Sequence, residues 1–88
     1  MDRDLIKQLR ARIREFEDKK ISGGDLGREI FFVAREVADP SEATLRRSLE
    51  MLGNRVYSLS EQSITEYVHP KILGVVDELE SELVLWGY

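Results

Sequence analysis

The residues of this chain that could carry out chemistry are few, and they include one histidine, His69. A single histidine and no cysteine exclude multi-histidine and thiolate metal sites. Ser63, His69 and Glu66 are the residue types of a catalytic triad, namely a nucleophile, a base and an acid. Their spacing supplies neither the strained nucleophile turn nor the oxyanion donors that such a site requires. We therefore predict no catalytic residue, and we expect His69, beside Pro70, to lie at a helix kink or end and to hydrogen-bond a freed carbonyl.

Gly23-Gly24 shares one feature with phosphate-binding loops, because a predicted helix follows it. The segment lacks the Gly-Lys-Ser/Thr ending and a preceding strand, and Asp25 would repel a phosphate. No spacing of Asp and Glu matches a calcium loop. We predict a tight turn here, and neither a metal nor a cofactor in the protein.

The remaining candidate chemistry is the recognition of a partner. Residues 61–88 hold six acidic groups against one basic group, whereas residues 1–20 hold five acidic and seven basic groups. Aromatic rings beside carboxylates can bind a basic protein, because the rings supply contact area and the charges steer the encounter. The predicted partner-binding residues are Glu66, Tyr67, Asp77, Glu78, Glu80 and Glu82. The alternative is a solvated helix face, although such faces usually mix both signs of charge.

These candidate residues lie on a long predicted helix. Its apolar residues follow one another at steps of three or four, which places them on one stripe: Ile64, Val68, Ile72, Val75, Leu79, Leu83 and Trp86. Pro70 interrupts the segment without changing the phase of the stripe. We expect one long helix that is kinked at Pro70 or broken there into two. Trp86 continues the core stripe, and Tyr67 is expected to be half-buried at its rim.

Three further helices should position this one. The first is predicted from about Arg3 to Lys20, with Arg10, Arg12 and Arg14 as solvated charges around it. Ser22 and Asp25 form a capping box that starts the second helix, which runs to about Ala38. Together with the two helices below, the short turns predict an all-α, up-and-down antiparallel bundle of four helices in one domain, residues 1–88.

The third helix should begin at Asp39-Pro40, because aspartate caps helices and proline suits the first helical position. Its apolar pattern continues through Gly53, which predicts a helix to about Tyr57. The alternative is that Gly53-Asn54 ends it. A further capping pattern places the start of the last helix near Ser58 or Ser60.

The second helix is apolar on more than one side. Either it is the most enclosed helix of the bundle, or Phe31 or Phe32 lies in a contact with another chain. The second alternative predicts a homodimer through Phe31, Phe32 or Trp86, and a structural or adaptor role.

Composition excludes several classes of function. The chain has 88 residues, a net charge of −4 and 34% charged residues. An acidic domain is repelled by nucleic acid. No apolar run approaches the roughly 20 residues needed to cross a membrane, and the start, Met-Asp-Arg-Asp, is unlike a signal peptide. We expect a cytoplasmic protein that binds neither membranes nor nucleic acid.

One resemblance points to a more specific function. The first two predicted helices, with Ile13-x-x-Phe16 and then Lys20-Ile21-Ser22 at the turn, resemble small bacterial immunity proteins of the colicin D type over about residues 9–33. The resemblance implies a protein that inhibits a toxin nuclease by covering its positively charged active site. On the basis of charge, the surface facing the toxin would include Glu66, Asp77, Glu78, Glu80 and Glu82.

Overall fold

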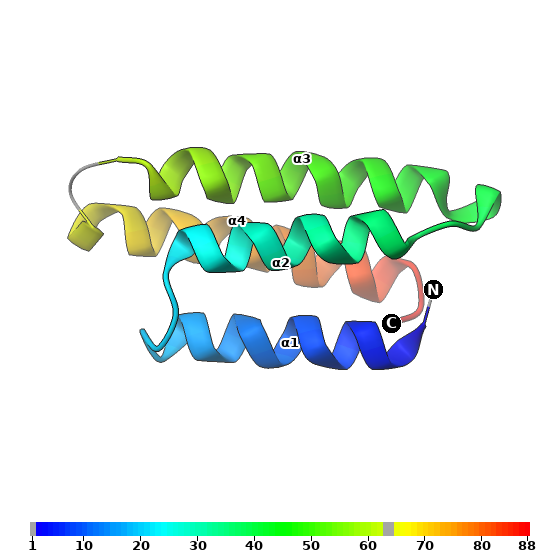
Figure 1. The fold of residues 1–88 in the computed structure, drawn as a ribbon, viewed down its shortest axis with the longest axis horizontal. Coiled ribbons are helices and arrows are strands. Elements are labelled where there is room, and N and C mark those ends of the chain that lie inside the picture. The colour runs from blue at the N-terminus through cyan, green and yellow to red at the C-terminus, as the bar shows by residue number, and fades with distance from the viewer. Residues whose placement is uncertain (1, 63–64) are drawn as a thin grey trace.

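Four α-helices run alternately up and down in the computed structural model, which describes residues 2–62 and 65–88 (Figure 1). The helices are α1 (Arg3–Glu17), α2 (Gly23–Glu36), α3 (Ala43–Ser60) and α4 (Thr65–Leu85), and a short 3-10 helix, η1 (Pro40–Glu42), precedes α3. No strand occurs within these ranges. The predicted all-α bundle of four helices is therefore confirmed. α2 lies between α1 and α3 and packs most closely against α3.

α1 follows the predicted stripe, and Ile6, Leu9, Ile13 and Phe16 are all buried. The helix ends at Glu17, three residues before the predicted end at Lys20. Lys19 takes the left-handed conformation, with φ of 60°, and the Lys20 amide donates to the Glu15 carbonyl at 2.8 Å. This is a Schellman-type end, which glycine usually provides. Because a lysine occupies that position, the sequence did not indicate that the helix ends there.

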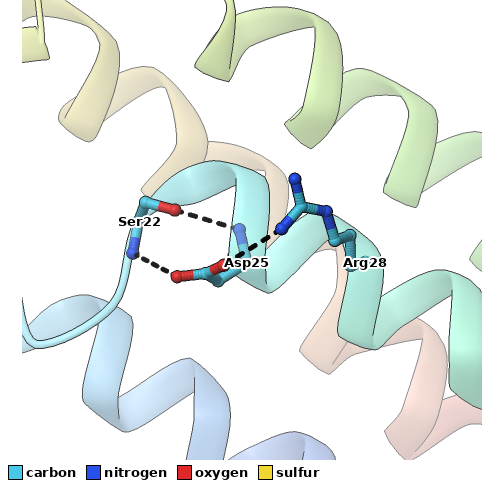
Figure 2. A network of polar contacts seen from close by, with 3 residues as sticks. All are labelled: Ser22, Asp25 and Arg28. Atoms are coloured by element: carbon cyan, nitrogen blue, oxygen red, sulfur yellow. Dashed lines mark hydrogen bonds and ion pairs between the residues drawn. The ribbon is translucent and has the colours of Figure 1, made fainter.

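The capping box that starts α2 is present as predicted (Figure 2). The Asp25 amide donates to Ser22 Oγ at 3.1 Å, and the Ser22 amide donates to Asp25 Oδ2 at 3.4 Å. Arg28 approaches the second carboxylate oxygen at 3.4 Å. Gly23 and Gly24 are therefore the first two residues of α2, and not a separate turn. α2 ends at Glu36, slightly before the predicted end at Ala38.

Asp39 caps η1 by accepting a hydrogen bond from the Ser41 amide at 2.9 Å. α3 then continues through Gly53 to Ser60, so the prediction that the helix survives Gly53 is confirmed. The predicted start of the last helix near Ser58 or Ser60 is wrong, because both residues belong to α3. Ser60 Oγ donates back to the Tyr57 carbonyl at 2.6 Å, and this bond uses the hydroxyl that the prediction assigned to a cap.

α4 is one helix that contains Pro70, so the alternative of two helices broken at this proline is wrong. Pro70 lies near the start of the helix and removes only the hydrogen bond to the Glu66 carbonyl. His69 does not mark a helix end. Its half-buried ring stacks on Phe16 of α1, with centroids 4.5 Å apart and an angle of 25° between the planes.

The predicted core stripe of α4 is confirmed from Val68 to Leu83, and Trp86 packs partly buried against it. Val76 is buried as well, which widens the stripe. Ile64 and Ser63 lie outside the described residues. Among the described helices, none is long and apolar enough to cross a membrane.

α2 and α3 approach each other at two glycines. A Cβ atom placed on Gly27 of α2 would lie 3.3 Å from the backbone nitrogen of Tyr57 in α3. A Cβ on Gly53 of α3 would lie 3.2 Å from Cγ2 of Ile30 in α2. Each helix therefore lacks a side chain where the other passes, and both glycines are buried.

The last residue, Tyr88, joins the carboxyl end of the chain to α1 and η1. Its hydroxyl donates to the carboxylate of Glu42, which is only 8% exposed. Arg10 donates to the Tyr88 carbonyl at 2.6 Å, and the Arg3 guanidinium lies 5.7 Å from the centre of the Tyr88 ring. The hydrogen bond to Glu42, together with burial, raises the pKa of the Tyr88 phenol above its ordinary value.

We expect Gly27→Ala to lower the free energy of unfolding by about 1 kcal/mol or more, because the added methyl would lie 3.3 Å from the backbone of α3, which must shift to admit it. The matched control is Gly74→Ala in α4, where nothing lies within 4 Å of the new methyl. There alanine should raise the free energy of unfolding by about 0.5–1 kcal/mol, since it favours the helix. Urea titration of both variants measures the two effects. Equal gains in stability would contradict the close approach of α2 and α3.

We expect Tyr88→Phe to lower the free energy of unfolding by about 1–2 kcal/mol near neutral pH, because a hydrogen bond to a carboxylate is lost. A raised pKa in the folded state contributes stability that is complete below the unfolded pKa of about 10. That contribution is lost as pH rises through the higher pKa of the folded protein. Urea titrations at increasing pH should therefore show the wild type and variant converging in alkali. A constant difference would contradict the assignment of the bond to the Tyr88 hydroxyl.

Candidate functional site

An open groove of about 540 Å³ lies between α3 and α4. We call it the α3–α4 groove, and its lining residues are Ser48, Met51, Leu52, Arg55, Asp77, Glu78, Ser81, Glu82 and Leu85. Two large apolar side chains of its lining are exposed, Met51 at 60% and Leu85 at 81%. Contiguous exposed apolar side chains that are rimmed by polar groups are typical of interaction sites.

The helical repeat explains why these residues share the groove. On α3, Ser48, Leu52 and Arg55 are spaced by four and three residues, so they lie on one face with Met51 at its edge. On α4, Asp77, Ser81 and Leu85 are spaced by four, with Glu78 and Glu82 beside them. Each face borders the buried stripe of its own helix. The groove is therefore the outer margin of the contact between α3 and α4.

Three predicted acidic residues, Asp77, Glu78 and Glu82, line this groove. Glu78 forms an ion pair with Arg55 across the groove, and Glu82 accepts a hydrogen bond from the Trp86 indole at 3.2 Å. Asp77 is exposed and makes no ion pair with another described residue. The lining thus carries three carboxylates and one guanidinium, which is a net charge of −2.

The structure does not bring the other predicted residues to the groove. Glu80 lies on the opposite side of α4, where its Oε2 is 3.2 Å from Nε of Arg10 in α1. Glu66 precedes Asp77 by three helical turns, so the two share a face of α4 at a distance. Tyr67 is 69% exposed, and the prediction that it is half-buried is wrong.

Cations from other helices neutralise part of the acidic charge in the last third of the chain. Arg10 of α1 pairs with Glu80, and Arg55 of α3 pairs with Glu78. Arg10 is therefore not the solvated charge that the sequence predicted. Counting charges along the chain overstated the local excess, because the neutralising groups are distant in sequence and adjacent in space.

The groove also contains residues that sequence reasoning missed. Met51 lies outside the core stripe of α3, and Leu85 lies outside that of α4. Met51 is followed by the core residue Leu52, and Leu85 lies between Val84 and Trp86, so neither residue stands apart in the sequence. The signal that could have identified them is their position off the buried stripe, at which a large apolar side chain has no core to enter.

The amino end of α2 is satisfied by its capping box, and Asp25 places a carboxylate there (Figure 2). Within the described ranges, no three His, Asp or Glu side chains converge in the manner of metal ligands.

A second apolar feature lies on α2, where Phe32 is 46% exposed. It borders two shallow hollows against α1, which it shares with Arg12 and Glu29. Phe31 and Trp86, the other residues predicted for a contact between chains, are half-buried.

Comparison of the chain with models of protein families, with curated proteins and with solved structures found no match. The resemblance to bacterial immunity proteins therefore stays a prediction, and the α3–α4 groove is the feature from which a function can be proposed.

Proposed function

We propose that this protein is a non-enzymatic interaction module that binds a basic protein through the α3–α4 groove. We propose further that it acts as an immunity protein, which inhibits a toxin nuclease by covering a positively charged active site. The observation that carries the proposal is the exposure of Met51 and Leu85 beside three carboxylates, Asp77, Glu78 and Glu82.

The two kinds of side chain support the proposal in different ways. Burying the apolar side chains against a partner would provide binding free energy of about 25 cal/mol for each Å² removed from water. The carboxylates would steer a basic partner and disfavour acidic ones. A nuclease must attract the phosphates of its substrate, so its active site has the charge that complements this groove.

We expect the triple variant D77K/E78K/E82K to bind a basic partner at least about a hundredfold more weakly, because each lysine replaces attraction by repulsion. Glu80 is left unchanged, since its reversal would also disturb the contact with Arg10. Wild-type binding should weaken as ionic strength rises from about 0.01 M to about 0.15 M. Isothermal titration measures both effects, with the product of the neighbouring gene as partner where that product is basic.

The matched control is E17K/E36K/E61K, which changes the net charge by the same amount outside the groove. Glu17 and Glu36 end α1 and α2, and Glu61 caps the end of α3. Lysine is favourable at these positions because of the helix dipole. Equal weakening by the two triple variants would show that net charge and not the groove controls binding. The immunity role further requires that the wild type, and not D77K/E78K/E82K, protects cells from the neighbouring toxin.

A second candidate function is self-association as a structural or adaptor bundle, and the exposed Phe32 favours it. This candidate predicts that the wild type sediments as a dimer at micromolar concentration and that Phe32→Ser sediments as a monomer. Val84→Ser is the control, because Val84 is also an exposed apolar residue but lies on a different helix. A monomeric wild type would eliminate the candidate.

A further inference from the structure

The backbone of the α3–α4 groove limits what can bind there. Its lining residues lie in the regular turns of α3 and α4, whose amides and carbonyls bond within their own helices. Beyond α4, the amides of Trp86, Gly87 and Tyr88 bond to the carbonyls of Glu82, Val84 and Leu83. A peptide that binds by strand addition needs free backbone partners of the kind that a sheet edge offers. The groove offers side chains only, which suits an occupant that satisfies its own backbone, as a helix does.

The dimensions of the groove suit a short helix. The lining runs from Ser48 to Arg55 on one side and from Asp77 to Leu85 on the other. At about 1.5 Å per residue these segments are roughly 10 and 12 Å long, which matches about two helical turns. Met51, Leu52 and Leu85 can then receive apolar side chains that recur at i, i+4 and i+7.

The groove already holds one cation, which belongs to the protein itself. Arg55 reaches from α3 to the carboxylate of Glu78 on α4. Both side chains are about half exposed, and an exposed pair of this kind contributes only about 0–1 kcal/mol to stability. The pair can therefore be exchanged without unfolding the bundle.

We propose that the α3–α4 groove binds a basic amphipathic helix of the partner, and that an arginine or lysine of this helix replaces Arg55 at Glu78. The inference rests on the proposed function and adds the form of the partner and the mode of recognition. The net charge of −2 in the lining is the reason for a basic occupant. This value includes Arg55, which neutralises one of the three carboxylates in the free protein and competes with the incoming cation.

The probe is an amidated peptide of about 14 residues, with leucines at i, i+4 and i+7 and arginines flanking them. Arg55→Gln should strengthen its binding about two- to fivefold, because the competing cation is removed. The matched control is Arg46→Gln, which makes the same change in net charge. Arg46 pairs with Glu50 at 3.0 Å within α3 and does not line the groove. Fluorescence anisotropy of the labelled peptide measures the affinities at low ionic strength.

A second pair of variants tests the apolar contact. Leu85→Ser should weaken binding about tenfold, because serine lacks most of the apolar area that the leucine would bury in the complex. Val84→Ser should leave binding unchanged, since Val84 is 67% exposed but does not line the groove. Both side chains are exposed, so neither substitution is expected to unfold the bundle. Circular dichroism should also show that the peptide becomes helical when it binds.

Several results would overturn this inference. They are an effect of Arg55→Gln no larger than that of Arg46→Gln, an effect of Leu85→Ser no larger than that of Val84→Ser, an unstructured bound peptide, or no binding of the peptide to the wild type. The proposed function has a separate test, because D77K/E78K/E82K is measured against a folded basic protein. If that variant loses binding while the peptide results fail, the partner uses a basic surface of another form.

Discussion

The close approach of α2 and α3 at Gly27 and Gly53 is the constraint on which the arrangement of the bundle depends. Two helices pack at short distance only where neither backbone carries a side chain at the crossing, and each helix provides one such position. This contact holds α3 firmly on one side. Its other side then meets α4 along Leu52 and Arg55, and the margin of that meeting is the α3–α4 groove. A methyl group at Gly27 therefore acts on the frame that supports the candidate site.

The net charge of each surface region in this protein depends on which helices pack together more than on position in the chain. The last third is strongly acidic, yet Arg10 and Arg55 come from other helices to meet two of its carboxylates. What remains beside the exposed Met51 and Leu85 is a moderate negative charge next to apolar surface. The proposed binding of a protein partner is based on that combination, because apolar contact and charge complementarity act together in protein interfaces.

Most of the fold could be predicted from the sequence, and the failures have identifiable causes. The capping box of Ser22 and Asp25 was predictable because all its hydrogen bonds are local. Ser60 misled the prediction because its hydroxyl bonds to the preceding turn. Lys19 ends α1 in the left-handed conformation that glycine usually adopts, so the residue type at this position did not predict the turn. Of the candidate site, the sequence identified Asp77, Glu78 and Glu82 but neither Met51 nor Leu85.

The sequence by itself determined that the protein is all-α, where its apolar stripes lie and how α2 begins. These properties follow from helical periodicity and from hydrogen bonds between residues a few positions apart. Only the tertiary structure decided that Glu78 faces Arg55, that Glu80 faces Arg10, and that Glu42 is buried and accepts a hydrogen bond from Tyr88. The physical reason is that periodicity specifies which side of a helix is buried, but not which helix covers it. The groove is a property of two helices together, and neither segment contains it alone.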